Sequence, residues 1–81
     1  MNIYAVYMHD HTGDNDIKVF TSDEERCEFI NQDAAHVMAI LIEDGYKCEK
    51  ITGCDICGVY VPEVSDIYYE WICCDTELKG V

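Results

Sequence analysis

Positive charge is the first thing that this sequence has little of. Lys and Arg together number 5 in 81 residues, against 17 Asp and Glu, so the formal net charge is -12. Nucleic-acid-binding proteins need a basic surface to contact the phosphate backbone, and this deficit excludes direct binding of DNA or RNA. Charge of one sign at this density makes the folded chain repel itself, and solubility alone does not require it. The natural partner is therefore cationic.

Long apolar runs are also lacking. No segment approaches the ~20 apolar residues of a membrane helix, and the N-terminus, Met1-Asn2-Ile3-Tyr4, has no signal-peptide pattern. We expect a cytoplasmic protein with no membrane contact. In that compartment the 6 Cys should remain reduced thiols, because disulfide frameworks belong to oxidising compartments.

The chain does have enough apolar material for one folded domain. Hydrophobic residues make up 49% and aromatic residues 11%, more than an acidic disordered tail contains. We expect residues 1–81 to form a single compact acidic domain. Its small size makes it marginally stable, and dimerisation would stabilise it.

A β-hairpin is predicted at the start of the chain. The β-branched and aromatic runs 3–8 and 17–20 predict two strands. Residues 9–16 are rich in turn formers and acids, and predict a long loop between the strands.

One long helix is predicted for residues 22–44. Thr21 or Ser22 serves as the N-cap, three acids follow in the first turn, and Gly45 supplies the left-handed residue that ends the helix. Apolar residues at helical spacing should pack on a sheet. This stripe consists of Cys27, Ile30, Ala34, Val37, Met38 and Leu41.

A second stripe on a neighbouring helix face joins Phe29, His36 and Ile40. It fits either a wide buried face in a small domain or the seam of a homodimer. The opposite, solvated side carries Glu25, Glu28, Gln32 and Glu43.

Further strands are predicted after the helix. Residues 46–52 and 59–61 form short strands around a turn at 53–58, and residues 64–74 form the clearest strand, while residues 77–81 are expected to be a frayed tail. Alternation in the last strand gives two faces. The face toward the helix carries Ile67, Tyr69, Trp71 and Cys73, and the other carries Asp66, Tyr68, Glu70 and Ile72. The predicted fold is α+β, with one long helix packed on a mostly antiparallel sheet of four to five strands in the order β-β-α-β-β.

The acids fall at regular intervals on these elements. Glu24 and Glu28 are one helical turn apart, with ~5–6 Å between their Cβ atoms, and Asp66 and Glu70 would lie ~13 Å apart on one strand face. Duplex DNA presents one charge per ~3.4 Å of axis along each strand. Rows of carboxylates can therefore imitate a phosphate path, and Tyr68 would add apolar contact area and a hydroxyl. The alternative is a solvated acidic surface with no specific partner.

In size, charge and Tyr- and Cys-rich composition the chain resembles phage-encoded DNA-mimic inhibitors, among them host-takeover proteins that block the nucleoid protein HU. The resemblance implies a protein that acts in the host cytoplasm as a homodimer and occludes the basic DNA-binding groove of a host protein. The residues implied in that contact are Asp10, Asp14, Asp16, Asp23, Glu24, Glu25, Glu28, Asp66 and Glu70.

A zinc-stabilised interaction module is the alternative function. Cys54 and Cys57 form a CxxC followed by Gly58, the form of a zinc knuckle. The remaining ligands would come from Cys48, Cys73, Cys74, His9 or His11. Because the second half is an adjacent Cys-Cys pair without a spacer, the usual CxxC…CxxC pattern fails, and we expect no metal.

Catalytic sites are not indicated. A thioredoxin-like role for Cys54 and Cys57 is disfavoured because acidic surroundings raise a thiol pKa. The acids of residues 9–16 lack the Gly and Glu positions of a calcium loop. His9 and His11 with these acids could outline a nuclease site, but phosphate substrates need cationic groups, and Lys18 is the only base nearby. We expect a binding protein without catalytic residues or cofactor.

Overall fold

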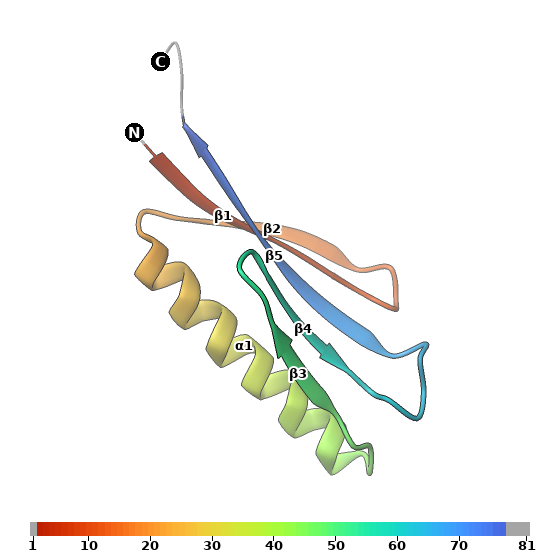
Figure 1. Cartoon of the computed structure of the whole chain (residues 1–81). Helices are drawn as coiled ribbons and strands as arrows, with labels where there is room; N and C mark the ends of the chain where they lie inside the picture. The colour runs from red at the N-terminus through yellow and green to blue at the C-terminus, as the bar shows by residue number, and fades with distance from the viewer. Residues whose placement is uncertain (1, 78–81) are drawn as a thin grey trace.

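The computed structural model describes residues 2–77 as one helix and one five-stranded antiparallel sheet (Figure 1). The elements are β1 (Asn2–Asp10), β2 (Asn15–Phe20), α1 (Asp23–Glu43), β3 (Glu49–Thr52), β4 (Ile56–Tyr60) and β5 (Tyr68–Glu77). The predicted α+β class, with one long helix on an antiparallel sheet, is confirmed. Over these residues, no helix combines the length and apolar composition that crossing a membrane requires.

The sheet is organised around the pairing of its first and last strands. Its order is β2-β1-β5-β4-β3, so β1 and β5 lie at the centre and β2 and β3 form the edges. β1 and β5 are antiparallel and stay in register from the Asn2–Glu77 pair to the Asp10–Tyr69 pair. The two longest strands thus hold the two hairpins together.

The first hairpin has a shorter loop than the sequence predicted. Pairing continues through Met8 with Asp16 and His9 with Asn15, which leaves residues 11–14 as the turn. The Asp10 carboxylate accepts hydrogen bonds from the Thr12 backbone N–H and hydroxyl, and Gly13 takes a positive φ of 89°. β2 is a solvated edge strand, so polar and acidic residues can occupy it, and this is why the prediction of a long acidic loop was wrong.

Both ends of α1 are as predicted. Ser22 is the N-cap, and its side chain accepts a hydrogen bond from the Glu25 N–H. At the other end, Gly45 has a φ of 90° and donates to the Ile42 carbonyl, while the Tyr46 N–H donates to Leu41. These two bonds form a Schellman motif, which satisfies carbonyls that the helix leaves unpaired.

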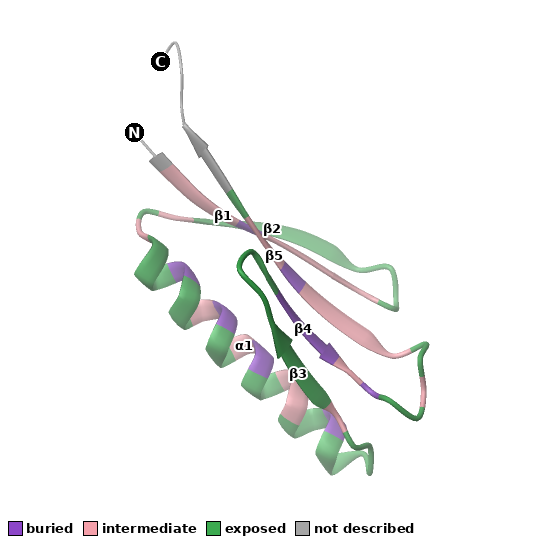
Figure 2. Cartoon of the chain, in the orientation of Figure 1, coloured by how far each residue is buried: buried purple, intermediate pink, exposed green. Residues whose placement is uncertain are grey.

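The core lies between the helix stripe and one face of the sheet (Figure 2). Ile30, Ala34 and Leu41 are buried, and Val37 and Met38 are half-buried against the same cluster. The sheet contributes Val6, Cys57, Val59 and Trp71, with Tyr69 and Cys73 packed around them. The predicted inward face of the last strand is therefore confirmed for its strand residues.

One member of the predicted helix stripe is wrong. Cys27 is exposed, and the neighbouring Arg26 is buried in its place. The Arg26 guanidinium donates to the Ala5 carbonyl, pairs with Asp23, and lies over the Tyr4 ring. A long aliphatic stem and a paired head let arginine occupy a position that sequence spacing assigns to an apolar residue.

The second helix stripe is divided between two environments. Phe29 packs on Phe20 with 5.4 Å between ring centroids, and Lys18 lies over its ring. His36 and Ile40 are exposed, so the stripe does not form one wide buried face. Its role as a homodimer seam stays a prediction. Glu25, Glu28, Gln32 and Glu43 are exposed, as predicted.

The strands after the helix begin at other positions than predicted. β3 starts at Glu49, and β4 extends over part of the predicted turn, because alternate residues Cys57 and Val59 point into the core. Two successive turns follow Val61, with hydrogen bonds from Val64 to Val61 and from Ile67 to Val64. β5 therefore begins at Tyr68. Glu77 belongs to β5, and the rest of the predicted tail, residues 78–81, lies outside the described residues.

The N-cap generates a first prediction. Ser22→Ala should lower the free energy of unfolding by about 1 kcal/mol, because the N–H of Glu25 loses its acceptor. Urea denaturation measures the change. Thr21→Ala is the matched control, because the Thr21 hydroxyl makes only a long exposed contact, 3.4 Å, with Glu25. Equal losses in the two variants would contradict Ser22 as the cap.

Candidate acidic groove

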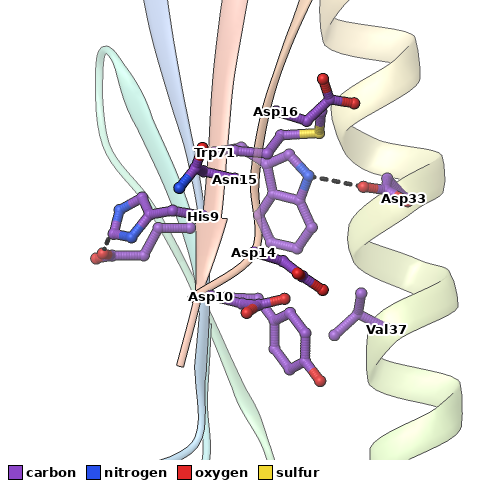
Figure 3. A pocket seen from close by; sticks show the side chains of 11 residues that line it. His9, Asp10, Asp14, Asn15, Asp16, Asp33, Val37 and Trp71 are labelled. Atoms are coloured by element: carbon purple, nitrogen blue, oxygen red, sulfur yellow. Dashed lines mark hydrogen bonds and ion pairs between the residues drawn. The ribbon is translucent and has the colours of Figure 1, made fainter. Parts of the chain in front are cut away.

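A cavity of about 430 Å³ opens between the turn end of the β1–β2 hairpin and α1 (Figure 3). Carboxylates stand around it and apolar side chains line it, and we call it the acidic groove. The carboxylates on the hairpin and the helix are those of Asp10, Asp14, Asp16 and Asp33, and the apolar lining is Met8, Val37, Tyr69 and Trp71. His9, Asn15 and Glu70 complete the lining.

Strand register explains why these side chains meet. Met8 pairs with Asp16 on one side and with Trp71 on the other, so the three share the sheet face that α1 covers. Asp10, two residues further along β1, pairs with Tyr69 on that same face. Acids of the hairpin are thereby placed beside the aromatic residues of β5.

Asp33 forms the helical wall of the groove. Its carboxylate accepts a hydrogen bond of 2.8 Å from the indole N–H of Trp71, which is only 2% exposed (Figure 3). A buried indole needs an acceptor, so this bond fixes both residues. The sequence reasoning missed Asp33. The available signal was a carboxylate three residues after Ile30 and four before Val37, inside the apolar stripe.

Asp10 is held in its ionised form. Partial burial opposes ionisation, but the hydrogen bonds from Thr12, the charge of His11 and the backbone of Asp14 outweigh it and lower the pKa of Asp10. The groove therefore keeps this negative charge at neutral pH and well into the acidic range.

The groove suits a cationic side chain. An ammonium or guanidinium group would lie between carboxylates that otherwise repel one another, and it would form charge-assisted hydrogen bonds. The aliphatic stem of the same side chain would pack on the half-buried Tyr69 ring. Charge and apolar surface together favour Lys or Arg over a bare inorganic cation.

A second group of predicted binding residues lies at the start of α1. Asp23, Glu24, Glu25 and Glu28 are all exposed. Asp23 pairs with Arg26, and Glu28 accepts a hydrogen bond of 3.4 Å from Gln32. The helix dipole favours acids at this end, so part of the cluster serves the helix itself.

Of the remaining predicted binding residues, Glu70 also lines the acidic groove, and Asp66 and Tyr68 join neither group. Asp66 is exposed in the turn before β5, so its predicted place on one strand face with Tyr68 and Glu70 is wrong. The turns that begin after Val61 remove it from the strand. Tyr68 and Glu70 are half-buried and lie on the sheet face away from α1.

Glu70 is the centre of a hydrogen-bonded network. Its carboxylate pairs with His9 at 3.0 Å and accepts a bond of 2.7 Å from the Tyr60 hydroxyl. Gly58 pairs with Glu70 across the strands, and a Cβ at Gly58 would come within 2.3 Å of the Tyr60 hydroxyl oxygen. The Tyr60 ring therefore lies over a glycine, which lets its hydroxyl reach Glu70. This hydrogen bond, with desolvation and the Glu70 charge, raises the pKa of Tyr60 to about 12.

The cysteines do not assemble into a zinc site within the described residues. Cys57 is 4% exposed in the core, whereas Cys54 is exposed in the turn before β4. Desolvation raises the pKa of the Cys73 thiol, which disfavours the thiolate that a metal needs. Between residues 2 and 77 no three or more His, Cys, Asp or Glu side chains are grouped to hold a metal ion.

Comparison of the chain with protein-family models, with curated proteins and with solved structures finds no match.

The Asp33–Trp71 bond generates a second prediction. Asp33→Ala should lower the free energy of unfolding by roughly 2 kcal/mol, because it leaves a buried indole N–H without an acceptor. Asp33→Asn is the matched variant, since its amide oxygen can still accept, and it should retain most of the stability. Urea denaturation followed by Trp71 fluorescence measures both. Equal losses would show that the bond does not stabilise the core.

The Tyr60–Glu70 bond generates a third prediction. Tyr60 has an ordinary pKa of 10.0 and a folded value of about 12, so the free energy of unfolding should fall as pH rises between these values. Below pH 10 this contribution is fully present. Alkaline titration of tyrosinate absorbance should show a group near 12 that Tyr60→Phe removes, while Tyr69, whose pKa burial also raises, remains. An unchanged titration in Tyr60→Phe would contradict the assignment.

Proposed function

We propose that this protein is a non-enzymatic DNA mimic that binds a basic DNA-binding protein and blocks its access to DNA. The observation that carries the proposal is the acidic groove, in which carboxylates fixed on a hairpin and a helix stand over aromatic residues. The expected target is a host protein with a basic DNA-binding surface, such as the nucleoid protein HU, in the host cytoplasm.

Rigid placement of the acids supports the comparison with DNA. Asp23 and Asp33 lie ten residues apart on α1, or about 15 Å along the helix axis. That is the axial length of four to five phosphates on one strand of duplex DNA. Five acids lie within that length, so their density along the helix axis is like that of phosphates: Asp23, Glu24, Glu25, Glu28 and Asp33.

The groove would also offer apolar surface to the proposed partner. Basic proteins hold DNA with Lys and Arg side chains, which have apolar stems as well as charged heads. The carboxylates would receive the heads, and the half-buried Tyr69, Met8 and Val37 side chains would receive the stems.

A DNA competition assay tests the proposal and is the fourth prediction. Unlabelled protein should displace a fluorescent DNA duplex from HU, and displacement should weaken steeply as salt is added, because screening shortens the reach of the charges. Asp10→Asn, Asp14→Asn and Asp16→Asn combined should weaken competition roughly tenfold through the loss of three partly exposed charge contacts.

The matched control removes the same charge elsewhere. Glu43→Gln, Asp55→Asn and Glu63→Gln change exposed acids outside the groove and should leave competition within about twofold of the parent. Equal weakening in both triple variants would show that net charge, and not the groove, governs binding. Failure to compete for HU even at low salt would reject HU as the target, and the same failure against other basic DNA-binding proteins would reject the mimic.

A further inference from the structure

The sheet face that α1 does not cover is largely apolar, and we call it the open face. Figure 2 shows exposed edge strands and half-buried central strands on the sheet. Ile17, Val19 and Ile51 are 63%, 61% and 57% exposed. By strand alternation the apolar residues of the open face are Ala5, Tyr7, Ile17, Val19, Ile51, Ile56, Tyr60, Tyr68 and Ile72.

Strand register joins these residues into continuous rows. Ile17 pairs with Tyr7, Tyr7 with Ile72, and Ile72 with Ile56, which gives one apolar row across four strands. Val19 and Ala5 are paired in the next row. Contiguous apolar surface of this kind is unusual on a monomer and marks an interaction site.

Acidic residues are scarce on the open face. The chain has 17 Asp and Glu, yet among the open-face strand positions between residues 2 and 77 just two are acidic, Glu49 and Glu70. Glu49 lies on the edge strand β3. The acidic groove and the exposed acids of α1 belong to the other side of the sheet.

The acid at the middle of the open face already has its partners. One carboxylate oxygen of Glu70 pairs with His9, and the other accepts the Tyr60 hydroxyl. The His9 ring is stacked on Tyr7 and meets Tyr68 edge-on, at centroid distances of 5.5 and 5.9 Å. A polar network satisfied from within can be buried against an apolar surface without orphaned groups.

We propose that the open face is a homodimer interface, packed face to face with the open face of a second copy. A closed two-fold pair of this kind covers the same patch on both subunits and leaves neither exposed. The result is a β-sandwich core with both helices, and both acidic grooves, on the outside.

The dimensions of the face fit a stable dimer. Its central strands have 9 and 10 residues, or about 30 Å at ~3.3 Å per residue, and five strands at ~4.8 Å spacing span about 20 Å. A full rectangle of these dimensions would have about 600 Å², and the shorter strands β2, β3 and β4 reduce the projected area to about 500 Å². Side-chain relief raises the accessible area toward the roughly 800 Å² per partner of a standard interface.

Charge favours a second copy over a basic partner as the occupant. A cationic protein gains most where carboxylates are dense, which is the helix side of the sheet. Two chains of net charge -12 repel each other, and the open face is the broad surface where they can meet with few acids in contact. The helix seam at Ile40 is narrower and is surrounded by exposed Glu and Asp.

Sedimentation equilibrium of the purified protein tests the interface and is the fifth prediction. A monomer–dimer equilibrium should appear, and its dissociation constant should decrease as salt is added, because screening relieves the repulsion between like-charged chains. Binding of the proposed basic partner should respond to salt in the opposite sense. The two proposals can therefore fail separately, since dimerisation is measured with no partner present.

Ile17→Thr combined with Val19→Thr should raise the dimer dissociation constant at least about a hundredfold, because four apolar contacts are lost per dimer. Both positions are exposed in the single chain and threonine suits a strand, so circular dichroism should show an intact fold. Ile40→Thr with Ile42→Thr is the matched control, with exposed apolar side chains on α1, and should leave the constant unchanged. Ile51→Thr, on the opposite edge, is the second open-face variant.

Three results would overturn the proposal. One is a monomer at every concentration up to the solubility limit in high salt. Another is dimerisation that the helix variant weakens and the open-face variants do not. The third is a monomer whose open-face variants lose competition for HU, which would assign this face to the basic partner.

Discussion

A single helix must cover a five-stranded sheet, and it can cover only one face. α1 lies along that face with Ile30, Ala34 and Leu41 inward, and the alternate residues of β1, β4 and β5 meet it. Two polar side chains enter this layer because each has a partner: Asp33 accepts from Trp71, and Arg26 pairs with Asp23 and donates to the Ala5 carbonyl. Without those partners a buried carboxylate or guanidinium would be strongly destabilising. Because α1 covers a single face of the sheet, its position determines which residues form the core and which polar residues can lie at the edge of the core.

Because α1 covers only one face of the sheet, the acidic residues of α1 and the exposed apolar residues of the strands lie on opposite sides of the sheet. Acids gather on the helix and on the hairpin end beside it, where Asp10, Asp14 and Asp16 meet Asp33 around the acidic groove. The opposite face keeps strand-forming apolar residues, with Glu70 tied to His9 and Tyr60. Two surfaces of opposite character thus coexist on one small fold, because the sheet stands between them.

Short-range signals in the sequence correctly predicted features that depend on neighbouring residues, such as helix ends and the alternation of a strand. Ser22 and Gly45 marked both ends of α1, and alternation around Trp71 identified the inward face of β5. The incorrect predictions concern segments whose secondary structure depends on tertiary contacts. Edge strand β2 extends through Asn15 and Asp16 because solvent surrounds it, and the turns after Val61 removed Asp66 from the predicted strand. Asp33 could not be recognised as part of the groove before the indole that holds it was placed. The open face was hidden for a related reason, since β1 is apolar or aromatic at positions that face both ways, and such a pattern does not say which face stays uncovered.

Repulsion among the carboxylates links the two proposed interactions to stability. A fold this small buries a smaller share of its surface than a larger domain does, and a net charge of -12 disfavours the compact state further. A cationic partner on the helix side would relieve that repulsion, and a second copy on the open face would add a core that the charge does not oppose. Each proposed partner would bind only the folded chain, so each would stabilise it by mass action. Salt would weaken the interaction with the cationic partner and strengthen the interaction with the second copy. The charge that disfavours the compact state of the isolated chain is thus the same charge that the proposed cationic partner would bind.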